Sequence, residues 1–139
     1  MSYNVHLFRF QRGECVDIDA ARLMDMLQPL IVGTEEEFDY VRLRAADSGE
    51  ADLYGVSEDA ATLMFSHWCF GDICELTAKL ARELDMVIVP PDRPAMIIDE
   101  RQRAHLPQEM VAEAVVVRTG TDIQRIIDPA SLGGEAAET

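Results

Sequence analysis

The chain has 139 residues, with 12 basic and 26 acidic side chains and a formal net charge of −14. Because 48% of the residues are hydrophobic, there is enough apolar material for the core of one domain, which argues against intrinsic disorder. The acidic excess disfavours binding to nucleic acid, which requires clustered Lys and Arg, and no apolar run is long enough for a membrane-spanning helix.

The first part of the chain predicts a strand followed by a helix. Residues 3–10 carry apolar side chains on both faces, which is typical of an inner strand. A helix is expected to begin after an N-cap at Asp17 or Asp19 and to stop by Gly33. Pro29 cannot donate a backbone hydrogen bond, so the helix should loosen there and end soon afterwards.

A meander of three strands should follow an acidic turn at residues 34–37. Alternating apolar side chains predict the strands, and Asp47, Ser48 and Gly49 have the composition of a hairpin turn. The three expected strands span residues 38–45, 51–56 and 61–68.

The clearest helical periodicity lies at residues 72–84. Asp72 followed by Glu75 resembles a capping box, and Glu75 with Lys79 forms a favourable i,i+4 pair. The remaining apolar segments predict shorter elements. Strands are expected at residues 86–89, 95–98 and 115–117, and helices at residues 106–112 and 121–127.

This element order, β-α-β-β-β-α-β followed by short elements, predicts an α+β fold. We expect a mainly antiparallel sheet with the two main helices on one face and a C-terminal extension. Over residues 3–90 the order of elements resembles a ferredoxin-like plan with an extra strand. Residues 1–130 should form a single domain, and residues 131–139 should be a frayed tail.

The use of cysteine predicts a reducing compartment. Cys15, Cys69 and Cys74 are odd in number and form no C-x-x-C pair, so three free thiols are expected. The N-terminus lacks the basic segment and apolar run of a signal peptide. We therefore expect a cytoplasmic protein.

Common catalytic and nucleotide-binding motifs are missing from the sequence. It contains no phosphate-binding glycine loop, no dinucleotide fingerprint, no nucleophile elbow and no H-E-x-x-H zinc motif. Its many carboxylates, such as Asp99 with Glu100, are more typical of a solvated surface than of a catalytic pair. No catalytic residue, metal or cofactor is predicted.

His67, Trp68 and Cys69 precede the long helix and allow several interpretations. A helix N-terminus favours a thiolate, and His67 could assist Cys69 if both lie on one face of a strand. The simpler interpretation is a packed strand end, with His67 and Cys69 against the core and Trp68 facing outward or capping the sheet. Zinc binding by His67, Cys69 and Cys74 is disfavoured because a second pair of ligands is absent.

Three prolines surround Arg93 in the loop of residues 90–94. The loop should be stiff, so Arg93 would be held outward at a low entropic cost, as in a recognition site. A rigid connector that ends the preceding strand is the alternative interpretation.

Half of the net charge is concentrated in residues 31–60, where two arginines stand against nine acids and the local net charge is −7. A concentrated negative field accelerates encounters with basic partners and repels nucleic acid, whereas solubility is the alternative explanation. The acids are Glu35, Glu36, Glu37, Asp39, Asp47, Glu50, Asp52, Glu58 and Asp59.

These observations favour a non-enzymatic module that binds a basic protein through its acidic meander. Tyr40 or Tyr54 would serve as an aromatic anchor. In size and charge alone, the chain resembles immunity proteins, which are small acidic proteins that neutralise toxins or nucleases.

The rival hypothesis is a small-molecule-binding protein or enzyme with a pocket near His67 and Cys69, to which His6 and Trp68 would contribute. A homo-oligomer is a third possibility, because residues 3–10 carry apolar side chains on both faces.

Overall fold

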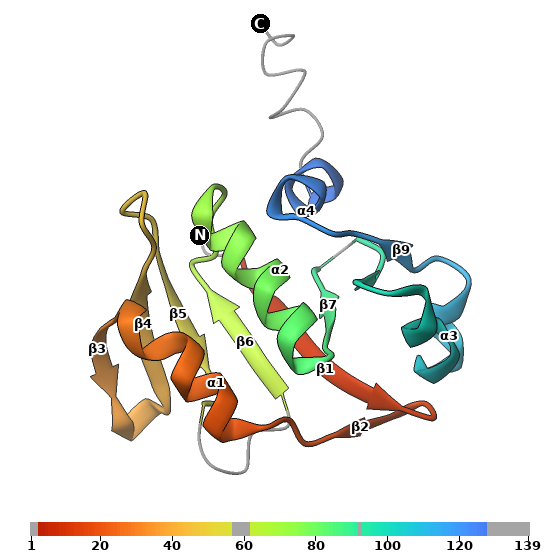
Figure 1. The fold of residues 1–139 in the computed structure, drawn as a ribbon, viewed down its shortest axis with the longest axis horizontal. Coiled ribbons are helices and arrows are strands. Elements are labelled where there is room, and N and C mark those ends of the chain that lie inside the picture. Colours follow the sequence, from red (N-terminus) through yellow and green to blue (C-terminus); the bar gives the residue numbers. More distant parts are fainter. Residues whose placement is uncertain (1–2, 57–61, 92, 128–139) are drawn as a thin grey trace, which may run out of the picture.

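The computed structural model describes residues 3–56, 62–91 and 93–127 (Figure 1). The strands are β1 (Val5–Gln11), β2 (Glu14–Val16), β3 (Ile31–Glu35), β4 (Tyr40–Arg44), β5 (Glu50–Tyr54), β6 (Thr62–Ser66), β7 (Val87–Val89), β8 (Met96–Ile97) and β9 (Val115–Val116). The α-helices are α1 (Ala20–Leu27), α2 (Asp72–Leu84), α3 (Gln108–Val111) and α4 (Gly120–Ile127). The 3₁₀ helices are η1 (Gln28–Leu30), η2 (Glu36–Phe38) and η3 (Glu100–His105).

The strands of the described residues form one nine-stranded sheet in the order β3-β4-β5-β6-β1-β7-β8-β9, with β2 paired to β1. Its pairings are antiparallel, apart from the parallel pair of β8 and β9. The predicted α+β class and mainly antiparallel sheet are confirmed. β1 lies between β6 and β7, as expected for an inner strand. Nine strands exceed the predicted core, and the sheet does not establish the ferredoxin-like plan.

Helices α1 and α2 pack on one face of the sheet (Figure 1). The core on this face includes the fully buried Leu7, Leu53 and Phe65 of the strands together with Leu23 of α1 and Leu80 of α2. Helix α4 packs against α2. A second, smaller cluster lies around β7, β8, η3 and α3, and consists of Val87, Ala95, Ile97, Leu106 and Ala114.

Two short strands differ from the predicted elements. Residues 31–35, expected as the end of a helix and an acidic turn, form β3. The helix ends earlier because Pro29 lies in a 3₁₀ turn that follows α1, and the residues after it pair with β4. Arg12 and Gly13 have φ angles of 55° and 83°, and this tight turn returns the chain as β2 where a simple break is expected. Such left-handed pairs are typical of hairpin turns.

Helix α2 matches its predicted bounds, but its N-terminus is built differently. The capping box expected between Asp72 and Glu75 is wrong, because Gly71 is the N-cap. The Asp72 N–H donates instead to Asp47 Oδ2 in the β4–β5 turn, at 3.0 Å. Glu75 Oε2 accepts the Gly120 N–H at 3.0 Å, so this carboxylate joins α2 to α4.

The C-terminal third contains short elements near the predicted positions, with η3 in addition. A capping box between Asp99 and Gln102 starts η3, and nothing in the apolar periodicity of the sequence indicates it. Residues 131–139, expected to be frayed, lie outside the described residues. None of the helices in the described ranges has both the length and the apolar composition that crossing a bilayer requires.

Candidate functional site

Four of the predicted acidic residues gather at the connection between β3 and β4. We call residues 35–39 the acidic tip: Glu35, Glu36, Glu37, Phe38 and Asp39. All five are exposed, and the Phe38 side chain is an exposed large hydrophobic group at 61%. Asp39 adopts a left-handed φ of 56°, and its carbonyl accepts the Gly55 N–H at 3.2 Å, which holds the tip against the end of β5.

The predicted anchors Tyr40 and Tyr54 lie directly beside the acidic tip. They face each other on β4 and β5, and their ring centroids are 4.8 Å apart. Both rings are half-buried. Glu58 and Asp59, which belong to the same predicted set, lie outside the described residues.

Asp47 lies at the opposite end of β4 from the acidic tip and is engaged within the fold. Its carboxylate accepts the N–H groups of Asp72 at 3.0 Å and of Gly49 at 2.9 Å. The bonds from Asp72 and then from Gly49 lower the pKa of Asp47, because they favour its charged form. Asp47 therefore serves as a cap for α2 that is contributed from another part of the chain.

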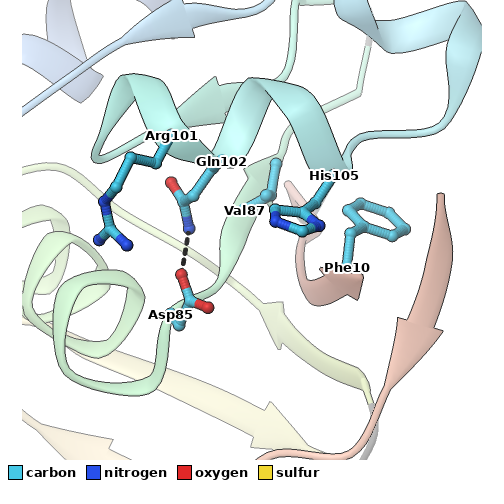
Figure 2. Close-up of a pocket in the computed structure, with 6 residues that line it drawn as sticks. All are labelled: Phe10, Asp85, Val87, Arg101, Gln102 and His105. Atoms are coloured by element: carbon cyan, nitrogen blue, oxygen red, sulfur yellow. Dashed lines mark hydrogen bonds between the residues drawn. The ribbon is translucent and has the colours of Figure 1, made fainter. Parts of the chain in front are cut away.

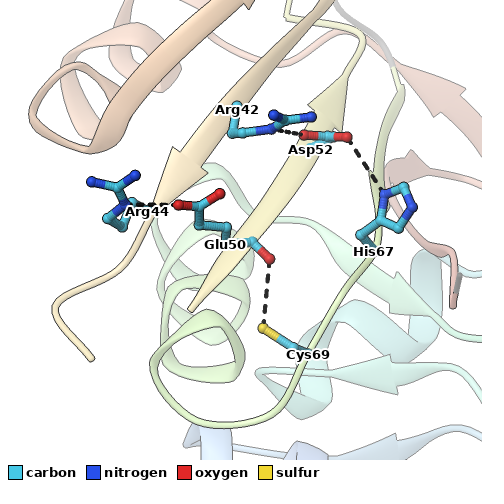
Figure 3. A network of polar contacts seen from close by, with 6 residues as sticks. All are labelled: Arg42, Arg44, Glu50, Asp52, His67 and Cys69. Carbon is cyan, nitrogen blue, oxygen red and sulfur yellow. Dashed lines mark hydrogen bonds and ion pairs between the residues drawn. The ribbon is translucent and has the colours of Figure 1, made fainter. Parts of the chain in front are cut away.

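Glu50 and Asp52 are paired with arginines on the neighbouring strand (Figure 3). Arg44 Nε lies 2.8 Å from Glu50 Oε2, and Arg42 Nε lies 2.9 Å from Asp52 Oδ1. These pairs follow from the register of β4 and β5, which places each arginine opposite its acid. The pairing reduces the negative charge available on this part of the meander.

His67 does not share a face with Cys69, so that expectation is wrong. Strand β6 ends at Ser66, and His67 has a left-handed φ of 60°. Its side chain is 67% exposed, and Nδ1 lies 3.5 Å from Asp52 Oδ2, whereas Cys69 turns toward the backbone of Glu50 (Figure 3). The expected packing of His67 against the core is also wrong.

The described residues contain no group of three His, Cys, Asp or Glu side chains that could hold a metal ion.

The thiols near α2 are not activated. Burial raises the pKa of Cys69, and the negative charge of Asp47 acts in the same direction. Deeper burial raises the pKa of Cys74 to about 12. Cys69 Sγ lies 3.7 Å from the Glu50 carbonyl, which accepts its weak hydrogen bond. Both groups are therefore neutral thiols at physiological pH, in contrast to the reactive-thiol hypothesis.

We expect alkylation with iodoacetamide near neutral pH to label the cysteines in the order of their exposure and thiolate content. Cys15, which is exposed, should react first, Cys69 more slowly than free cysteine, and Cys74 only when the protein unfolds. Peptide mass spectrometry over time measures the three rates. A Cys69 that reacts faster than free cysteine would contradict this assignment.

Trp68, Cys69 and Arg93, all predicted as secondary site candidates, lie together in one pocket. We call it the aromatic pocket; its volume is about 550 Å³. It is lined by Tyr3, Trp68, Cys69, Phe70, Arg93 and Ile127. Sequence reasoning missed Tyr3, Phe70 and Ile127. The pocket combines four segments that are far apart in the sequence, so no motif with a fixed residue spacing indicates that they meet.

Trp68 forms a buried wall of the aromatic pocket, so the expectation that it faces outward is wrong. It is 6% exposed, and its Nε1–H donates to Thr77 Oγ1 at 3.0 Å. Thr77 Oγ1 in turn donates to the Ile73 carbonyl at 2.8 Å. This chain of bonds satisfies the indole N–H and fixes the ring against α2.

A second pocket, of about 310 Å³, lies between β1, β7 and η3 (Figure 2). Its polar groups are largely engaged in the fold. Gln102 Nε2 donates to Asp85 Oδ1 at 3.0 Å and to the Met86 carbonyl at 3.2 Å, and His105 Nδ1 accepts the Arg12 N–H at 3.2 Å. These contacts attach η3 to the sheet and indicate a structural role.

Comparisons of this chain with protein-family models, with curated proteins and with solved structures find no match. The functional argument therefore depends on the geometry of the described residues.

Proposed function

We propose that this protein is a non-enzymatic binding module that recognises a basic protein through the acidic tip. The observation that carries the proposal is Phe38, an aromatic side chain 61% exposed and surrounded in sequence by four exposed carboxylates. An apolar anchor within a polar rim is the usual arrangement of an energetically important contact in a protein interface.

The charges of the acidic tip are available to a partner. In the part of the chain that the structure describes, none of Glu35, Glu36, Glu37 and Asp39 takes part in an ion pair. They differ in this respect from Glu50 and Asp52. A cluster of uncompensated carboxylates attracts Lys and Arg of a partner and accelerates association.

The partner that fits is a basic protein with an apolar recess for Phe38. The tilted pair of Tyr40 and Tyr54 beside the tip extends the aromatic surface. An inhibitor of immunity-protein type, which neutralises a basic toxin or nuclease in the cytoplasm, combines these properties. Asp47, Glu50 and Asp52 would contribute to the overall field, not to direct contacts.

The test is affinity capture from a native lysate, followed by binding measurements with the captured protein. Wild type should bind a basic protein at low salt and release it near 1 M salt, where the Debye length is about 3 Å. Phe38→Ala should weaken binding by about tenfold or more, as for an interface hot spot. Neutralising the tip with E35Q, E36Q, E37Q and D39N should weaken binding at low salt and make its salt dependence shallower.

A control variant with the same change of charge is E14Q, D25N, E109Q and E113Q, which alters four exposed acids outside the tip. It should bind almost as tightly as wild type. Equal losses in the two variants would mean that only net charge matters, and the absence of any basic partner at low salt would remove the proposal.

Two finer predictions belong with this proposal. The strand order β5-β6-β1-β7, with α1 and α2 on one face, supports a ferredoxin-like unit to which β3 and β4 are added.

Self-association would use the other face of β1, where His6, Phe8 and Phe10 stack with centroid distances of 5.9 and 5.4 Å. Light scattering tests this self-association, because it measures the molar mass of the particle in solution.

A further inference from the structure

The aromatic pocket is built from segments that the acidic tip does not contain. Tyr3 precedes β1, Trp68 to Phe70 connect β6 to α2, Arg93 lies between β7 and β8, and Ile127 ends α4. The tip lies where β5 ends and β6 is about to begin, whereas Trp68 follows the end of β6. The two features therefore occupy opposite ends of β6 and can act independently.

The wall of the pocket is aromatic and preorganised. The Trp68 ring lies 5.8 Å from Tyr3 in a tilted arrangement and 5.7 Å from Phe70 at 90°. The Trp68 N–H donates to the Tyr3 carbonyl at 3.3 Å, and the indole N–H is bonded to Thr77. Because these rings are held by one another and by the backbone, a flat apolar ligand can be bound without ordering a mobile wall.

Among the described residues that line the pocket, Arg93 carries the charge, as a guanidinium. Arg93 Nε donates to the Ile127 carbonyl at 3.2 Å, which attaches the β7–β8 loop to the end of α4. A guanidinium carries five N–H donors and matches the geometry of a carboxylate. The neighbouring Cys69 is a neutral thiol and adds polarisable apolar surface.

We propose that the aromatic pocket binds a small aromatic carboxylate, with its ring against Tyr3, Trp68 and Phe70 and its carboxylate at Arg93. The volume of about 550 Å³ lies within the range of small-molecule sites. An aromatic cage for a methylated ammonium is the competing chemistry, but a cation would be placed beside Arg93. Contact between the Trp68 ring and its two neighbours also favours a continuous wall over a cage.

The net charge of −14 opposes the binding of an anion mainly at low salt. At physiological ionic strength the Debye length is about 8 Å, so distant carboxylates are largely screened while Arg93 acts at contact distance. Binding of the anion should therefore tighten as salt rises from very low to physiological concentration.

The test compares three probes of nearly equal shape: 3-phenylpropanoate, its neutral amide and 3-phenylpropylammonium. Trp68 is the single tryptophan of the chain, so its fluorescence reports on this pocket alone. We expect the carboxylate to change the emission at millimolar or lower concentration and the amide to bind about tenfold more weakly. Tighter binding of the ammonium probe, or no response to any probe at about 10 mM, would overturn the proposal.

Two variants separate the charge from the aromatic wall. Arg93→Gln, at an exposed position, should lower the affinity for the carboxylate probe to that for the amide probe. The affinity for the amide probe should stay unchanged. Phe70→Leu should weaken both probes by a similar factor. Arg125→Gln changes an exposed arginine on α4 that does not line the pocket, and should bind as wild type does. An equal loss in Arg93→Gln and Arg125→Gln would also overturn the proposal.

Discussion

Replacing Gly120 by alanine should lower the free energy of unfolding by about 2–3 kcal/mol, because a close helix contact leaves no room for a methyl group. A Cβ at this position would lie 2.5 Å from Glu75 N and 2.7 Å from the carbonyl carbon of Cys74. Both atoms belong to the backbone of α2 and cannot move aside as a side chain would. Helix α4 must shift instead, and its buried residues Ile123 and Ile127 would lose contacts.

Urea unfolding measures this effect as a lower midpoint with an unchanged slope. The matched control is Gly33→Ala, because the nearest atom there, Arg42 Cβ, would be at 3.8 Å, an ordinary contact. Its stability should stay within about 0.5 kcal/mol of wild type. Since Ile127 also lines the aromatic pocket, Gly120→Ala should shift the emission of Trp68 to longer wavelength before unfolding. Equal stabilities of the two variants would contradict the close packing of α4 on α2.

Sequence reasoning succeeded where a long periodic pattern decides the structure. The stripe of apolar residues over 72–84 predicts α2 with its observed bounds, because thirteen residues at helical spacing leave little choice of buried face. Alternation likewise predicts β4 and β5 to within a few residues. In each case the buried residues of the element itself contain the signal.

Short elements and single backbone conformations were missed for a different reason. Strand β3 depends on pairing with β4, and its own sequence, Ile-Val-Gly-Thr-Glu, has too little alternation to compete with the helix before it. The left-handed φ of His67 reverses the direction of its side chain relative to a strand. A pattern that assumes a continuous strand therefore places His67 on the wrong face.

For the candidate site, too, local sequence patterns predict some features, whereas others depend on tertiary packing. Composition locates the acids of residues 31–60, but it does not tell which of them are engaged within the fold. The hairpin turn at residues 45–49 contains part of that information, since it places Arg44 opposite Glu50 and Arg42 opposite Asp52. The bond from Asp72 to Asp47 and the gathering of the aromatic pocket depend on tertiary packing, for which the sequence has no local signal.

Gly71 is the position where tertiary packing and backbone geometry act together, and Gly71→Ala should destabilise the protein strongly. Its φ of 92° and ψ of −137° lie in a region that only glycine adopts readily, so alanine costs about 1–3 kcal/mol from strain alone. A Cβ would in addition overlap Asp47 Oδ2, the acceptor of the Asp72 N–H at the start of α2. The variant should lose both the relaxed backbone and this cap.

The pH dependence separates these two losses. The pKa of Asp47 is lowered in the folded protein, so its stabilisation is present above the unfolded pKa and is lost as the pH falls through the folded pKa. Asp47→Ala should therefore be less stable than wild type at neutral pH and approach it in acid. The stability of Gly71→Ala should approach that of wild type only in part as the pH falls, because the backbone strain at residue 71 is independent of pH. Other carboxylates with lowered pKa values, such as Asp99 and Glu100, contribute equally to each protein and cancel in the differences. If Gly71→Ala unfolds like wild type at neutral pH, the cap from Asp47 and the conformation of Gly71 are both wrong.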